Sequence, residues 1–182
     1  MPTKTAKATI TKKSRKAGSS QADGPAAISK KRVKPLNNPK VLSHGTLECH
    51  DLAASRRFYE DFLGLECVRH SKITMLLRKG GYWGVVCAQV GKKVRPVGVF
   101  NHWGMDMKSK AAVDRARVLA LKHKAEYGIR KVMKITEMHG TYAFYIQDLD
   151  GNYWEFQYAG VGQEKGKGRY DKHFERGDII AM

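Results

Sequence analysis

The sequence predicts an α+β fold: two βαβββ modules form one open, cup-shaped mixed sheet, and a disordered basic arm precedes them. Two observations predict the modules. A strand, helix, strand, strand, strand pattern occurs twice, and His44 and Gly64 of the first copy have counterparts in His102 and Gly128 of the second. A pattern present only twice favours a pseudo-symmetric pair over a solenoid. A third observation, the charge of residues 1–40, predicts the arm.

Composition excludes several classes of protein. The chain has 182 residues, of which 42% are hydrophobic and 9% aromatic, too many for a wholly disordered polycation. No apolar run approaches the ~20 residues of a membrane helix, and the N-terminus lacks the apolar region of a secretory signal. The chain has three cysteines, which is an odd number, and all three lie within apolar segments. We therefore expect free, buried thiols in a reducing compartment, the cytoplasm.

Residues 1–40 carry most of the chain's positive charge. Nine Lys and two Arg stand against Asp23, which gives +10 of the total +17, and the segment has no aromatic residue. It cannot bury enough apolar surface to offset its ordering entropy. Three interpretations stay open: an arm for nucleic acid or another anionic surface, a solubilising tail, and a transit peptide.

The first module covers residues 41–92. A strand is expected over 43–49, Asp51 is a candidate N-cap, and Gly64 ends the following helix. Three strands are expected at 65–69, 73–78 and 82–90, the last two joined by a turn at Gly80-Gly81. The residues with helical spacing are Leu52, Ser55, Tyr59, Phe62 and Leu63.

The second module covers residues 98–159 and repeats this order. A strand is expected over 99–107, Ser109 caps the helix, and Gly128 ends it. Strands follow at 131–138, 141–147 and 153–158, with a turn at 150–152. The helix stripe comprises Val113, Ala116, Ala120, His123 and Tyr127. Residues 160–182 form a C-terminal extension that either folds over the cup or contacts a second subunit.

Strand alternation separates a polar face from a bulky face in each module. His44 lies on the polar face of its strand, and His102 and Glu155 lie on the polar faces of theirs. If these faces converge, two imidazoles and one carboxylate line a wet cavity. A buried carboxylate needs a partner, and two His with one carboxylate form the facial triad suited to non-haem Fe(II) or another divalent metal.

These segments resemble the vicinal oxygen chelate superfamily, which includes glyoxalase I, bleomycin-resistance proteins and extradiol ring-cleaving dioxygenases. The resemblance covers about two thirds of the chain. It implies paired modules around a divalent metal, with His44, His102 and Glu155 as the ligands. The motifs that carry it are Leu42-Ser43-His44, Phe58-Tyr59, Leu63-Gly64-Leu65, Asn101-His102 and Asp148-Leu149-Asp150-Gly151-Asn152-Tyr153-Trp154-Glu155.

The resemblance extends to two further groups of residues. A fourth ligand of the glyoxalase and epimerase enzymes would fall on Cys87 or Gln89, and neither is a carboxylate, which favours three ligands. His139 and Tyr145 resemble part of the extradiol dioxygenase signature, although Leu149 replaces its proline and the spacer after His139 is one residue short.

The resemblance to single-domain extradiol dioxygenases implies an oxidoreductase of aromatic hydrocarbon catabolism. Its substrates would be a catechol-type diol and O2, and its cofactor Fe(II), with Mn, Zn or Ni as alternatives. Tyr145 would hydrogen-bond the substrate, and His139 would be the acid–base residue.

Three other functions remain open. A glyoxalase- or epimerase-like lyase, isomerase or transferase has the same fold. A non-catalytic protein could use the cup only to bind a small molecule. A nucleic-acid-associated protein would act through residues 1–40. We also expect a homo-oligomer.

Overall fold

The structure is a computed structural model that describes residues 36–37, 39–40, 42–80, 83–138 and 140–159. All of these belong to one unit of the chain, which begins at Leu36. The predicted arm and the C-terminal extension therefore lie almost wholly outside the described residues. No helix among the described residues is long and apolar enough to cross a membrane.

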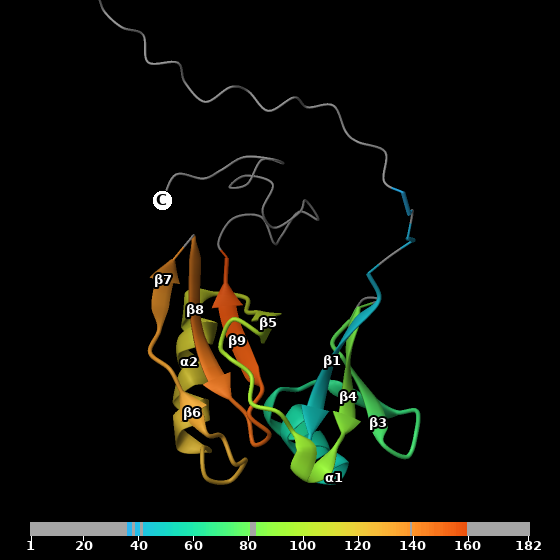
Figure 1. Cartoon of the computed structure of the whole chain (residues 1–182). Coiled ribbons are helices and arrows are strands. Elements are labelled where there is room, and N and C mark those ends of the chain that lie inside the picture. Colours follow the sequence, from blue (N-terminus) through green and yellow to red (C-terminus); the bar gives the residue numbers. More distant parts are fainter. Residues whose placement is uncertain (1–35, 38, 41, 81–82, 139, 160–182) are drawn as a thin grey trace, which may run out of the picture. The chain divides into compact units, whose positions relative to one another are not determined.

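The first module forms a four-stranded sheet (Figure 1). Its strands are β1 (His44–Cys49), β2 (Glu66–Arg69), β3 (Thr74–Arg78) and β4 (Gly84–Gln89). Strand β1 pairs in parallel with β4, β4 is antiparallel to β3, and β3 is antiparallel to β2. The predicted strands are thus all present, each shorter by a residue or more at its ends.

The second module repeats this topology. Strand β5 (His102–Asp106) pairs in parallel with β9 (Tyr153–Tyr158), which is antiparallel to β8 (Thr141–Gln147). The outer position is shared by β6 (Lys131–Val132) and β7 (Thr136–Met138), both antiparallel to β8. The equivalent strand order confirms the duplication and the α+β fold class.

One strand expected over 131–138 is divided in the structure, so that prediction was wrong. Between β6 and β7, the Met133 carbonyl accepts a hydrogen bond of 2.9 Å from Nε of Arg117, a residue of helix α2 (Lys110–Lys122). The Met133 amide still donates to Tyr145 at 2.8 Å. The register also shifts by one residue, from Val132 opposite Ile146 to Thr136 opposite Ala143, so a bulge interrupts the strand there.

The helix of the first module begins as predicted and then widens. Asp51 caps α1 (Leu52–Arg57) by accepting a hydrogen bond from the Ala54 amide, and a π-helical turn, η1 (Phe58–Phe62), continues it to Gly64 at φ +66°. The wider turn buries two successive residues, Phe58 and Tyr59. The residues chosen by the 3.6-residue helical spacing of the sequence included Tyr59 but not Phe58, because that spacing does not allow for a π-helical turn.

The two modules share one hydrophobic core. The core combines buried residues of β1, β4 and α1 with buried residues of β8, β9 and α2, and the rings of Tyr59 and Trp154 lie 5.4 Å apart. Each sheet thus turns its bulky, helix-bearing face toward this core. The hydrogen-bonded ladders of the described residues form two sheets, one per module, where the sequence analysis expected one continuous sheet.

The three cysteines contribute to this core as free thiols. Cys49, Cys67 and Cys87 are buried and form no disulfide, which confirms that prediction. Burial raises the pKa of the Cys67 thiol to about 12. A thiol with so high a pKa is protonated at neutral pH and serves as packing, not as a nucleophile.

A buried acidic turn joins the modules. Asp150, between β8 and β9, accepts hydrogen bonds from the His50 amide (2.8 Å), His50 Nδ1 (2.7 Å) and Ser55 Oγ (2.6 Å) of the first module. Asp148 accepts from its own turn, from Trp154 Nε1 at 3.0 Å and from the Tyr59 hydroxyl at 3.3 Å. Burial raises the pKa of Asp148 from its usual 3.8 to about 6.

This raised pKa predicts an unusual dependence of stability on pH. The folded protein holds a proton on Asp148 more tightly than the unfolded chain, so the residue stabilises most below pH 4 and that contribution is lost as the pH rises through 6. Asp148→Asn does not titrate. The unfolding free energy of wild type minus that of the variant should therefore fall by up to about 3 kcal/mol from pH 4 to pH 7.

Urea denaturation at several pH values measures this difference. The comparison cancels the titration of the other carboxylates, which both proteins share. If the unfolding free energy of wild type minus that of the variant rose with pH, the raised pKa of Asp148 would be contradicted.

Candidate metal centre

Three of the predicted site residues meet on the polar face of the second sheet. Glu155 lies opposite Tyr145 in the β8–β9 register, and it is only 8% exposed. The Tyr145 hydroxyl donates to Glu155 Oε1 at 2.8 Å, and His102 Nε2 lies 3.4 Å from Glu155 Oε2. The rings of His102 and Tyr145 are in edge contact, with centroids 5.0 Å apart. Strand alternation had placed His102 and Glu155 on the polar faces of their strands, and the contacts agree.

The position of His102 fixes which ring nitrogen faces the carboxylate. Its Nδ1 lies 2.7 Å from the carbonyl oxygen of Val99, and a carbonyl can only accept, so Nδ1 carries a proton. In the neutral ring, Nε2 then presents its lone pair toward Glu155 Oε2. An imidazole nitrogen and a carboxylate oxygen that face each other suit a shared cation, which is either a proton on Nε2 or a metal ion.

The residues present fit a divalent metal ion at this position. Two ligands about 2.1 Å from one ion lie roughly 3.0–3.4 Å apart at ordinary coordination angles, and the His102–Glu155 separation is 3.4 Å. The Val99 carbonyl accepts a hydrogen bond from His102 Nδ1, and the Tyr145 hydroxyl donates one to Glu155 Oε1, so both candidate ligands are held in place.

Gly104 keeps the space beside the carboxylate free. A Cβ at this position would lie 2.9 Å from Gln157 Nε2 and 3.6 Å from Glu155 Oε2. A larger residue would therefore displace Gln157 and crowd the candidate ligand.

The third predicted ligand, His44, lies on the first sheet and is not grouped with His102 and Glu155. It is exposed at the start of β1, where its Nδ1 contacts Ser43 Oγ at 2.9 Å. Because both sheets turn their bulky faces to the shared core, their polar faces are directed away from it and do not converge. Among the described residues, no three His, Cys, Asp or Glu side chains are grouped to hold a metal.

The two possible fourth ligands face the core. Cys87 is fully buried, and Gln89 Oε1 accepts a hydrogen bond of 3.1 Å from the Leu52 amide at the start of α1. Both therefore lie on the helix-bearing face of the first sheet, opposite the face of His44. The geometry leaves neither side chain available to complete the site.

The two predicted catalytic residues differ in what the structure describes. His139 lies outside the described residues. Tyr145 is half-buried, and its burial and its hydrogen bond to Glu155 raise the pKa of its hydroxyl well above the usual 10. The group is thus a protonated donor at neutral pH.

Sequence reasoning missed two components of this site. The Val99 carbonyl orients His102, but every residue has a carbonyl, so no sequence signal marks it. Gln157 contacts the space beside Gly104, and its position two residues after Glu155 on the same strand face could have identified it.

Comparison with solved structures identifies the fold. A possible glyoxalase from Bacillus cereus matches with a TM-score of 0.51 at 24% identity, over 65% of this chain and 98% of that chain. A glyoxalase/bleomycin resistance protein from Albidiferax ferrireducens T118 matches with a TM-score of 0.50 at 18% identity, over 64% and 96%.

An integron cassette protein from the mobile metagenome of the Halifax Harbour sewage outfall matches with a TM-score of 0.51 at 18% identity, over 66% and 99%. No protein-family model and no curated protein matches the chain. The chain therefore has the βαβββ fold of glyoxalase/bleomycin resistance proteins, and at these identities the likeness concerns the fold.

Removing either facing ligand should weaken metal binding. We expect His102→Ala and Glu155→Ala each to bind Mn²⁺ or Fe²⁺ at least about tenfold more weakly than wild type, because each removes a ligand. His70→Ala changes an exposed imidazole that contacts Thr74 and is the matched control. Anaerobic calorimetry measures the affinities, and unchanged binding by both ligand variants would exclude this centre.

Proposed function

We propose that this protein is a divalent-metal-dependent enzyme of the vicinal oxygen chelate superfamily, acting on a substrate with two neighbouring oxygen atoms. The observation that carries the proposal is that His102 Nε2 and Glu155 Oε2 face each other, 3.4 Å apart, on the polar face of the second sheet. The fold of the glyoxalase-type structures supports it. A bound ion would supply Lewis-acid activation of the substrate oxygens.

A second copy of the chain completes the site in this proposal. The polar faces of the two sheets are directed away from the common core, so His44 of one copy would lie opposite His102 and Glu155 of the other. Strands β1 and β5 are the edges of their sheets, and unpaired edges favour association. Beside them, Leu42 is 79% and Phe100 98% exposed, and an interface would cover both.

The chain's own residues then have distinct tasks. Glu155 and His102 hold the ion, and Val99 keeps the His102 ring in the tautomer that can ligate. Tyr145 donates its proton to Glu155 at 2.8 Å and borders the space where a substrate oxygen would enter. It therefore positions the carboxylate and can transfer its hydrogen bond to a bound hydroxyl.

The first candidate reaction is extradiol cleavage of a catechol-type diol with O2, with Fe(II) as the metal. The hydroxyl of Tyr145 at the centre supports it, as does the absence of Cys87 and Gln89 from the polar face, which leaves three ligands. The second candidate is a glyoxalase-like lyase or isomerase reaction with Ni, Zn or Mn. The likeness of the fold to a possible glyoxalase and to a glyoxalase/bleomycin resistance protein supports that reaction.

Substrate tests after anaerobic metal loading separate these reactions. With Fe(II), we expect catechol or 2,3-dihydroxybiphenyl to give a yellow ring-cleavage product, and Tyr145→Phe to lower the rate about 100-fold. Tyr142→Phe removes an exposed hydroxyl bound to Asp114 and is the matched control. Turnover of a hemithioacetal alone would favour the second reaction, and metal-independent ligand binding without turnover would refute both.

A mixing experiment tests the shared site. His44→Ala and Glu155→Gln each disable a site, but mixed dimers would contain one intact site of two. After exchange of subunits, about 25% of the sites should bind metal tightly. If a single chain supplied all three ligands, mixing would restore none.

Two other expectations remain proposals. Contact with nucleic acid or another anionic surface through residues 1–40 should weaken steeply with salt. A cytoplasmic location agrees with the three free thiols.

A further inference from the structure

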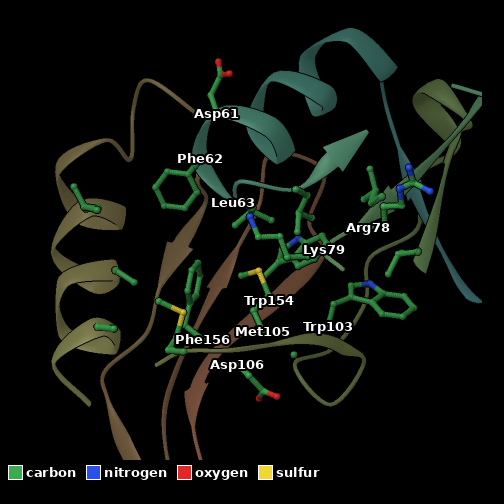
Figure 2. Close-up of a pocket in the computed structure, with 18 of the residues that line it drawn as sticks. Asp61, Phe62, Leu63, Arg78, Lys79, Trp103, Met105, Asp106, Trp154 and Phe156 are labelled. Carbon is green, nitrogen blue, oxygen red and sulfur yellow. The ribbon is translucent and has the colours of Figure 1, made fainter. Parts of the chain in front are cut away.

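We propose that the cavity between the two modules binds a small amphipathic organic anion, with an apolar ring or chain and one carboxylate or sulfonate group. The cavity measures about 770 Å³, within the roughly 300–1,000 Å³ of small-molecule sites. It lies on the helix-bearing side of both sheets, between the end of η1, the β3–β4 hairpin, β5 and α2 (Figure 2).

Its wall is mostly aromatic and aliphatic. Trp103, Trp154, Phe156 and Met105 come from β5 and β9, and Trp83 immediately precedes β4. The rings of Trp83 and Trp103 lie 5.7 Å apart, yet Trp83 remains 43% exposed. An apolar ligand body would cover this ring, and flat or flexible hydrocarbon suits a wall of indole rings and thioether carbons.

The charges at its mouth favour an anion. Lys79 extends among the lining side chains in Figure 2, and its Nζ donates to the Gly64 carbonyl at 2.6 Å, which leaves two further N–H donors. Arg115 of α2 is exposed at the same cavity. The carboxylates of Asp61 and Asp106 also belong to the lining, but in Figure 2 both point away from the other side chains.

A third cation, Arg78, is already neutralised. Its guanidinium forms two hydrogen bonds to Glu66, at 2.7 and 2.8 Å. Lys79 and Arg115 are therefore the groups that would meet the ligand's anionic end.

This cavity is separate from the candidate metal centre. Trp154 and Phe156 line the cavity, while Glu155, between them on β9, faces the opposite side of the sheet. The proposal therefore does not depend on the proposed enzymatic activity, and its test uses no metal.

Fluorescence of 1-anilinonaphthalene-8-sulfonate with the full-length chain tests it. We expect one probe per chain and displacement by decanoate. Ala112→Phe, which fills the cavity from α2, should weaken binding at least about tenfold, because its ring occupies the ligand's space. Ala111→Phe alters the neighbouring exposed position and should bind as wild type does. Residues 1–40 are the same in both variants, so anion binding by that segment cancels.

A second pair of variants tests the charge. Lys79→Gln should weaken decanoate about two- to fivefold, the size of an exposed ion pair, and leave decanol unchanged, whereas Lys72→Gln, outside the cavity, should affect neither. Several weak probe sites, equal affinity for decanol and decanoate, or full binding by a folded Ala112→Phe would each overturn the proposal.

Discussion

The acidic turn between β8 and β9 is the contact on which the arrangement of the two modules depends. Asp150 enters the first module and satisfies the His50 amide and the Ser55 hydroxyl, while Asp148 closes its own turn. Carboxylates buried this deeply are costly unless each oxygen is hydrogen-bonded. The network therefore fixes the position of this turn against the first module. That position determines which faces of the two sheets pack together.

The location of the candidate site follows from this packing of the two modules. Once the helix-bearing faces share a core, each polar face is directed outward, and His44 is separated from His102 and Glu155. The same arrangement leaves a cavity between β5 and α2 on one side and η1 and the β3–β4 hairpin on the other. The outer face thus offers polar ligands, and the inner cavity offers aromatic surface.

Much of the local structure could be read from the chain. Asp51 and Ser109 cap their helices as expected, and Gly64 ends the first helix with positive φ; α2 ends earlier than predicted, at Lys122, and a turn separates it from Gly128. These features depend on residues close in sequence, so local chemistry decides them. The contact of Tyr145 with Glu155 was also accessible, because strand alternation and a short hairpin fix their register.

The sequence alone determined the duplicated βαβββ pattern, the free buried thiols and the polar faces that carry His44, His102 and Glu155. Only the tertiary structure decided that two sheets form instead of one, that a bulge beside the Arg117–Met133 contact interrupts the strand after β6, and that His44 lies apart from its expected partners. Alternation along a strand tells which side chains share a face. It does not tell how two faces far apart in sequence are oriented, because long-range packing and the buried contacts of Asp148 and Asp150 set that orientation.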